Sequence, residues 1–236
     1  MSSRMRSFAA VFLAGLCILL LSACGSGDIT AYDSSMVEAG DSQYVFTGSA
    51  GEYIEAVNGI YEKENGEELF SEVDEWEISH GERGMQIDAP MKIYSFCPGE
   101  EQGFWPIIYL YETEDEDNLE SIQITYDHHN MRDNTYEKYM EFCTYCVKAL
   151  VPDIETEEAL EYCRSINDAG IEKSVPYEEK DIYGKTPEKM FSIDNVGIYP
   201  YYVIGSRSNF CIVPLSDEGK AAYEKKGAEI YELNAG

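Results

Sequence analysis

The chain has 236 residues, with 17 lysines and arginines against 45 aspartates and glutamates, for a formal net charge of −28. A balance this acidic argues against nucleic acid as a partner and against binding to anionic lipid through a cluster of basic residues. The length suits one domain with short additional segments, and a domain of this size buries enough surface to fold without a metal or a disulfide.

The N-terminus has the layout of an export signal. Met1–Ser7 carries two arginines and no acid, and Phe8–Leu21 is apolar or small throughout, which is too short for a convincing membrane span. The run ends at Leu21-Ser22-Ala23-Cys24, which resembles the signal of bacterial lipoproteins, where the cysteine becomes lipidated after cleavage. The resemblance covers Met1–Cys24; the alternative is an ordinary secretory signal with a chance cysteine.

The resemblance implies a protein held by lipid on Cys24 at the outer face of the cytoplasmic membrane. We therefore expect residues 1–23 to be the signal peptide, residues 24–48 to be the lipidated cysteine and a flexible tether, and residues 49–236 to form a single domain. Gln43–Thr47 is the only strand expected before that domain.

The first expected helix follows Ser49-Ala50-Gly51-Glu52, which has the Ser-x-x-Glu form of a capping box. Apolar residues then recur at helical spacing until Asn65-Gly66. From Val73 to Tyr126 the period drops to two, which predicts an antiparallel meander. Within it, Met85, Ile87 and Ala89 alternate with polar residues, and Phe104–Tyr111 is apolar enough for a central strand.

Two further helices are expected as an antiparallel hairpin. The first is capped near Asn134 and stopped by Pro152, with an apolar stripe that includes Cys143 and Cys146. The second runs from Thr156 to Ala169, with Gly170 as its cap.

Strands return after Ile171, and Ser216 is the expected cap of a last short helix. The strands are expected at Val175–Tyr177, Ile182–Tyr183, Met190–Val196, Ile198–Ile204, Phe210–Val213 and Ile230–Leu233. Because helices and strands are segregated, the predicted class is α+β: antiparallel sheet with an N-terminal helix and a central helical hairpin.

Seven cysteines are present, of which Cys17 lies in the signal and Cys24 is the lipidation site. The remaining five are Cys97, Cys143, Cys146, Cys163 and Cys211, an odd number that does not suggest a disulfide framework. Cys143-x-x-Cys146 lies inside a helix, so we expect it to pack with Cys163 as small apolar side chains. A disulfide from Cys163 to one of the pair, or metal or redox chemistry, remains the alternative.

Three other features bear on function. Asp127-His128-His129-Asn130 ends a strand, and its two histidines are the natural general-base candidates of an enzyme. The acid-rich Glu112–Asn118 fails the pattern of a calcium-binding EF-hand loop and reads as a solvated hairpin tip. The chain has 19 tyrosines, and three of them, Tyr199, Tyr201 and Tyr202, lie close together in sequence. Tyrosine suits both strand packing and the recognition of glycans or proteins.

The expected function is binding at the cell envelope, with the membrane as a partner through Cys24 and a glycan, peptide or protein as the ligand of Tyr199, Tyr201 and Tyr202. The sequence lacks phosphate-loop, nucleophile-elbow and zinc-protease motifs. We expect no cofactor and no metal. A hydrolase of the envelope using His128, His129 and an acid is the second hypothesis, and an assembly, inhibitor or immunity-type partner is the third.

Overall fold

The computed structural model describes residues 32–40, 43–97, 106–127, 135–172, 187–203 and 207–234, which belong to a folded unit spanning Ala31–Gly236. The strands are β1 (Met36–Gly40), β2 (Gln43–Phe46), β3 (Glu77–Gly81), β4 (Met91–Phe96), β5 (Ile107–Thr113), β6 (Leu119–Asp127), β7 (Lys189–Ile193), β8 (Val196–Val203), β9 (Arg207–Pro214) and β10 (Glu229–Glu232). The helices are α2 (Ala50–Asn65), α3 (Thr135–Leu150), α4 (Thr156–Glu172) and α5 (Asp217–Lys225), with a 3-10 turn at Val73–Glu75. The predicted α+β class, the N-terminal helix and the helical hairpin are confirmed.

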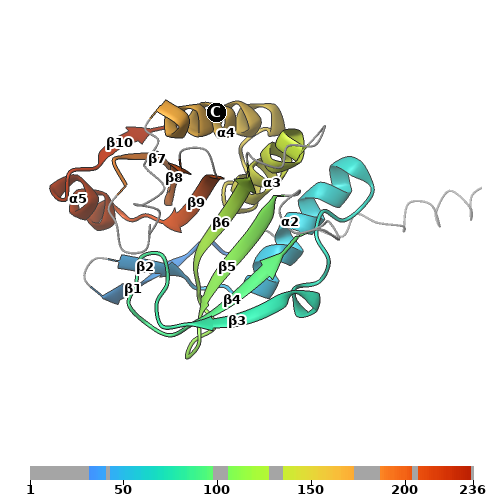
Figure 1. Cartoon of the computed structure of the whole chain (residues 1–236), viewed down its shortest axis with the longest axis horizontal. Coiled ribbons are helices and arrows are strands. Elements are labelled where there is room, and N and C mark those ends of the chain that lie inside the picture. Colours follow the sequence, from blue (N-terminus) through green and yellow to red (C-terminus); the bar gives the residue numbers. More distant parts are fainter. Residues whose placement is uncertain are drawn as a thin grey trace, which may run out of the picture. The chain divides into compact units, whose positions relative to one another are not determined.

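One large sheet organises the domain, with strand order β10-β7-β8-β9-β6-β5-β4-β3 (Figure 1). The meander β3–β6 and the meander β7–β9 meet at their last strands, because β6 pairs antiparallel with β9 from Ile122↔Ile212 to Asp127↔Arg207. Among the strands of the described residues, β10 pairs parallel with β7 and the other pairs are antiparallel. The β1–β2 hairpin joins the sheet through the pair Phe46↔Leu119 on β6.

Helices α2, α3 and α4 pack on one face of the sheet, which we call the helix face (Figure 1). Alternation along each strand supplies its apolar side chains, since Ile122, Ile124 and Tyr126 of β6 share a face with Phe210 and Ile212 of β9. These side chains join the inward stripes of the helices in the main core. The helices therefore cover one side of the central strands β5, β6, β9 and β8. They do not cover the opposite side of these strands.

Local sequence signals explain where α2 begins and ends. The Ser49 hydroxyl accepts from the Glu52 amide at 3.2 Å, while the Glu52 carboxylate accepts from the Ser49 amide at 2.8 Å. Gly66 closes the helix with φ 79°, a left-handed conformation that favours glycine. The capping box and the terminating glycine predicted for this helix are both present.

Two boundaries differ from expectation. Residues 24–48 were expected to be tether apart from a strand at Gln43–Thr47, which is present as β2. The strand β1 was not expected; it forms a hairpin with β2, and the buried Tyr32 hydroxyl donates to the Gly48 carbonyl at 2.8 Å. Gly170 was expected to cap a helix ending at Ala169, but α4 continues to Glu172. A Cβ at Gly170 would lie 2.5 Å from the Cβ of Pro200 on β8, so this glycine allows close packing of helix on sheet.

The predicted signal, Cys24, His128, His129 and the strands expected at Val175–Tyr177 and Ile182–Tyr183 lie outside the described residues. No helix in the part of the chain that the structure describes is long and apolar enough to cross a membrane.

Candidate functional site

The face of the sheet opposite the helices carries two pairs of tyrosines. Tyr109 and Tyr111 lie on β5, Tyr199 and Tyr201 lie on β8, and the central strands β6 and β9 run between them. Each pair is spaced by two residues, so both members point to the same side of the sheet. We call this side of strands β5, β6, β9 and β8 the tyrosine face.

The strand register fixes how far apart the two pairs lie. Tyr109 is opposite Gln123, Gln123 is opposite Cys211, and Cys211 is opposite Tyr199, so these residues form one row across four strands. Three strand spacings of about 4.8 Å place the two tyrosine strands roughly 14 Å apart. Within the strip of β6 and β9 between them, Gln123 is half-buried and the other side chains of this face, Ser121, Thr125, Asn209, Cys211 and Val213, are buried.

Amide and hydroxyl groups line this strip. The Gln123 amide nitrogen and the Thr125 hydroxyl donate to the Asn209 side-chain oxygen at 2.9 and 2.8 Å. The Tyr111 hydroxyl donates to the Gln123 side-chain oxygen at 3.0 Å, and the Asn209 nitrogen donates to the Tyr201 carbonyl at 3.2 Å. The network holds each amide in one orientation, as a preformed binding surface requires.

Apart from the buried Glu120 at its covered end, the strip is uncharged, although the chain is strongly acidic. On the tyrosine face, β6 contributes Ser121, Gln123 and Thr125, and β9 contributes Asn209, Cys211 and Val213. Along these strands the buried Glu120 precedes Ser121, and Asp127 opposite Arg207 lies at the other end of the ladder. A site of this composition suits a neutral polar ligand, because an ionic ligand would lose its hydration without gaining a counter-charge.

One end of the tyrosine face is covered and the other is more accessible. At the covered end, Tyr111 and Tyr199 are 2% and 6% exposed and pack with Met85, Met190 and Leu215. At the other end, Tyr109, Gln123 and Tyr201 are half-buried. The accessible part of the face is therefore the region around Tyr109, Gln123 and Tyr201, with Asn209 and Thr125 beneath it.

The covering segment is Glu82–Ala89, which we call the strap. The alternation of Met85, Ile87 and Ala89 predicted a strand, but the strap contains no strand. Met85 and Ile87 are buried because the strap lies against the sheet, where its backbone amides bond to the side chain of Glu120 rather than to a neighbouring strand. A buried irregular segment thus produced the same period-two pattern as a strand.

The three tyrosines predicted as the binding site do not share a face. Tyr199 and Tyr201 lie on the tyrosine face, and burial raises the pKa of Tyr199 well above its ordinary value. Tyr202, one residue further, is half-buried on the helix face of the same strand. Five residues of the tyrosine face were not predicted: Tyr109, Tyr111, Gln123, Thr125 and Asn209. Alternation indicates which of them share a side within each strand, but not that β6 and β9 are neighbours.

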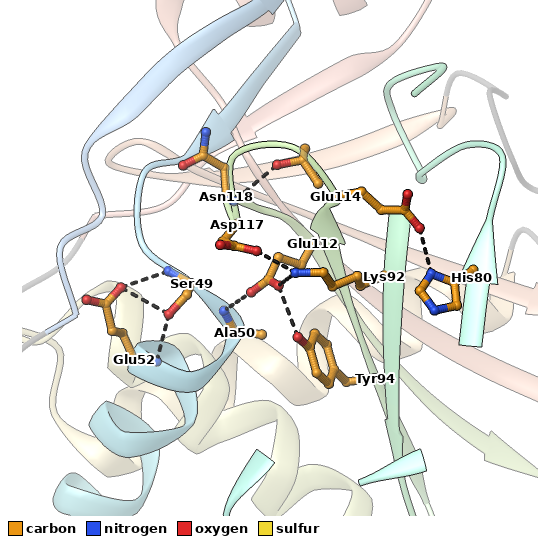
Figure 2. A network of polar contacts seen from close by, with 11 residues as sticks. Ser49, Ala50, Glu52, His80, Lys92, Tyr94, Glu112, Glu114, Asp117 and Asn118 are labelled. Atoms are coloured by element: carbon orange, nitrogen blue, oxygen red, sulfur yellow. Dashed lines mark hydrogen bonds and ion pairs between the residues drawn. The ribbon is translucent and has the colours of Figure 1, made fainter. Parts of the chain in front are cut away.

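The acid-rich run Glu112–Asn118 was predicted to be a solvated hairpin tip. Residues Glu114–Asp117 are exposed as predicted, but Glu112 belongs to β5 and is buried (Figure 2). Glu112 is 3% exposed, and its carboxylate accepts from the Ala50 amide at 2.8 Å and from the Tyr94 hydroxyl at 3.1 Å. Lys92 lies 3.5 Å from Glu112 and 2.5 Å from Asp117, and the hydrogen bond to Asp117 raises the pKa of Lys92. Glu112 thus places a negative charge at the positive end of α2, where it stabilises the helix.

One histidine of the three is described. The His80 ring nitrogen Nδ1 lies 2.6 Å from the Glu114 carboxylate in an exposed pair on β3 and the turn after β5 (Figure 2). An exposed pair of this kind contributes little to stability. Because His128 and His129 lie outside the described residues, the general-base hypothesis for them stays a prediction.

The cysteines of the helical hairpin are buried thiols. Cys143 and Cys146 of α3 and Cys163 of α4 are 0% exposed in the main core, as expected for small apolar side chains. Burial raises the pKa of Cys146 to about 12 and also raises the pKa of Cys143 and Cys163. They are protonated at neutral pH, so none is activated as a nucleophile. Among the described residues, no group of three or more histidine, cysteine or acidic side chains is arranged to hold a metal ion.

Comparison with protein-family models, with curated proteins and with solved structures finds no match for this chain.

Proposed function

We propose that the protein is an extracytoplasmic bacterial lipoprotein that binds a neutral glycan on the tyrosine face. The anchor would be the lipid on Cys24, at the end of the Leu21-Ser22-Ala23-Cys24 signal. The domain would then be displayed at the outer face of the cytoplasmic membrane. A binding role fits a face that carries ordered amide groups and aromatic rings but no activated nucleophile among the described residues.

A single observation carries the choice of ligand: two pairs of tyrosines flank an uncharged strip of amides and hydroxyls on adjacent strands. Tyrosine presents a flat apolar ring, against which the apolar face of a sugar packs, and a hydroxyl that bonds to the ligand or to neighbouring side chains. The half-buried Gln123 side-chain oxygen, which accepts one bond from Tyr111, has a second lone pair for a sugar hydroxyl. The absence of charge from the accessible part of the strip, around Gln123, favours a neutral sugar over a phosphate, a nucleotide or an acidic polysaccharide.

The direct test is a binding screen of the chain from Ala31 onward, which spans the folded unit, against neutral and acidic cell-wall and dietary glycans. Binding should raise the melting temperature, because a ligand at about a hundred times its dissociation constant adds roughly 2.7 kcal/mol to stability. A hit confined to neutral glycans is expected. Binding only to acidic glycans or to basic peptides would contradict the choice of ligand.

Matched variants locate the site. Tyr201→Ala and Tyr109→Ala should each weaken glycan binding by about tenfold or more, which corresponds to ~1.4 kcal/mol of lost binding energy. Tyr202→Ala is the control, since it removes a half-buried tyrosine from the same strand on the opposite side of the sheet. Equal losses for Tyr201→Ala and Tyr202→Ala would show that binding does not depend on the tyrosine face.

A further inference from the structure

The large apolar side chains that the described part of the chain leaves exposed all lie on edge strands. Val37 on β1, Ile78 on β3 and Tyr231 on β10 are 42%, 53% and 42% exposed. Strands β10 and β3 are the two ends of the strand order, and among the described strands β1 pairs with β2 alone (Figure 1). An edge strand has a row of backbone N–H and C=O groups with no neighbouring strand, so it is a template for a further strand.

Two of these edges have features that oppose the addition of a strand. The β1–β2 ladder contains a register shift toward the end of β1, and such a bulge interrupts the row of backbone groups. Strand β10 has four residues, and its Tyr231 ring stacks on Phe191 of β7 at a centroid distance of 5.4 Å. The exposed aromatic side chain of β10 therefore already has a partner within the domain.

Strand β3 lacks both features. Its five residues pair with β4 in an unbroken register from Glu77↔Ser95 to Gly81↔Met91, and they include no proline and no lysine. Ile78 is not part of the apolar clusters of the described residues. In an antiparallel ladder, alternate residues direct their N–H and C=O groups away from the neighbouring strand, so about two or three residues of β3 present these groups at the edge.

The chain around β3 is strongly acidic. Between Lys63 and Arg83 it has eight aspartates and glutamates and no lysine or arginine, and Glu75 and Glu77 at the beginning of the strand are exposed. The turn after β5 adds exposed acids beside His80 at the other end of the strand (Figure 2). This edge therefore attracts a strand with basic side chains, whereas it repels a second copy of a chain whose formal net charge is −28.

The two sides of β3 present different side chains to an added strand. Ile78 is opposite Tyr94 on β4, and Tyr94 is opposite Leu110 on β5, so Ile78 lies on the helix face. Glu77, one residue earlier, lies on the other side of the sheet. A complementary strand has an apolar residue opposite Ile78 and a basic residue opposite Glu77, so basic and apolar residues alternate along it.

We propose that the edge of β3 binds an extended segment of a partner protein in which basic and apolar residues alternate. The segment adds a strand to the sheet: its backbone bonds to the outward N–H and C=O groups of β3, while Glu77 and Ile78 select its side chains. One added strand buries less surface than a standard protein interface, so the contact is weak and reversible. It goes beyond the proposed function, because the glycan site uses β5, β6, β9 and β8.

The test uses a short peptide of alternating lysine and valine, titrated into the chain from Ala31 onward and followed by fluorescence anisotropy. This peptide should bind, more weakly as salt is added, and a peptide of alternating glutamate and valine should not. Two further peptides are methylated on the backbone nitrogens of the lysines alone or of the valines alone. One of the two should lose binding and the other keep it, because alternate amides of a strand face β3. Equal binding of both methylated peptides would overturn the proposal.

Matched variants locate the contact. Glu77→Lys should weaken binding by about tenfold at low salt, and Ile78→Lys should abolish it, because lysine at a sheet edge opposes pairing with a further strand. Glu229→Lys is the control, since it makes the same change of net charge at an exposed acid that begins the other edge strand β10. Equal losses for Glu77→Lys and Glu229→Lys would mean that the peptide is held only by long-range attraction to an acidic protein.

Hydrogen exchange of the wild-type protein reports the added strand directly. The bound lysine–valine peptide should slow exchange of those β3 amides that do not bond to β4, and it should leave the β10 amides unchanged. Protection at another edge, or at no edge, would overturn the proposal. So would a dimer that forms through β3 without peptide, because the occupant would then be a second copy of the chain.

The glycan screen separates this proposal from the proposed function. Glu77→Lys and Ile78→Lys should bind neutral glycan as the wild type does, and Tyr201→Ala should bind the peptide as the wild type does. Loss of peptide binding alone, or of glycan binding alone, therefore identifies which of the two proposals fails.

Discussion

Removing the Glu112 side chain tests how β5 holds the beginning of α2. In Glu112→Ala the Ala50 amide and the Tyr94 hydroxyl lose a charged acceptor at 2.8 and 3.1 Å, while Lys92 keeps Asp117 (Figure 2). Hydrogen bonds to charged groups contribute about 1.5–3 kcal/mol each, and the buried amide left behind costs a comparable amount unless water replaces the carboxylate. Partial replacement by water leaves an expected loss of about 2–4 kcal/mol.

The assay is urea unfolding followed by circular dichroism, with the melting temperature measured in parallel. For a domain of this size each kcal/mol of lost stability lowers the melting temperature by about 2–4 °C, so Glu112→Ala should melt roughly 4–16 °C below wild type. Glu112→Gln retains an oxygen for the Ala50 amide and should lose only ~1 kcal/mol. Asp115→Ala is the control, since Asp115 is an exposed acid of the same turn and should change stability by less than about 0.5 kcal/mol. If Glu112→Ala and Asp115→Ala are equally stable, the carboxylate does not anchor α2.

Three further changes test other parts of the molecule. Gly170→Ala should lower the free energy of unfolding by about 1–3 kcal/mol, because the new Cβ would lie 2.5 Å from the Cβ of Pro200 on the sheet. Gly51→Ala in α2, where the nearest atom would be 3.6 Å from the new Cβ, should be neutral or raise it by up to ~1 kcal/mol; the opposite order would show that helix propensity decides both. When the thiols of the native protein are labelled, the half-buried Cys97 should react faster than the buried Cys146, and denaturant should make the two rates equal. Equal rates under native conditions would mean that the core of the helical hairpin is open. Cys24→Ser should move the protein out of the membrane fraction and leave the precursor without lipid by mass spectrometry; unchanged fractionation would mean that something other than lipid on this cysteine holds it.

The buried carboxylates show why part of the site could not be predicted. Glu112 and Glu120 flank an acid-rich turn, and a run of acids in sequence normally indicates a solvated loop. Their burial depends on backbone amides far away in the chain, that of Ala50 for Glu112 and those of the strap for Glu120. No local pattern around either residue carries that information.

The chain by itself determined the elements whose causes are local. The capping box at Ser49, the terminating Gly66, the apolar stripe of α3 and the alternation of β5 and β6 each depend on residues within a few turns or strand steps. Tertiary structure decided what depends on neighbours distant in sequence: the pairing of β6 with β9, the grouping of Tyr109 with Tyr201, and the need for glycine at position 170. Alternation specifies which residues of one strand share a side. It does not specify which strands lie next to one another, because that choice is made by burial and hydrogen bonding across the whole sheet.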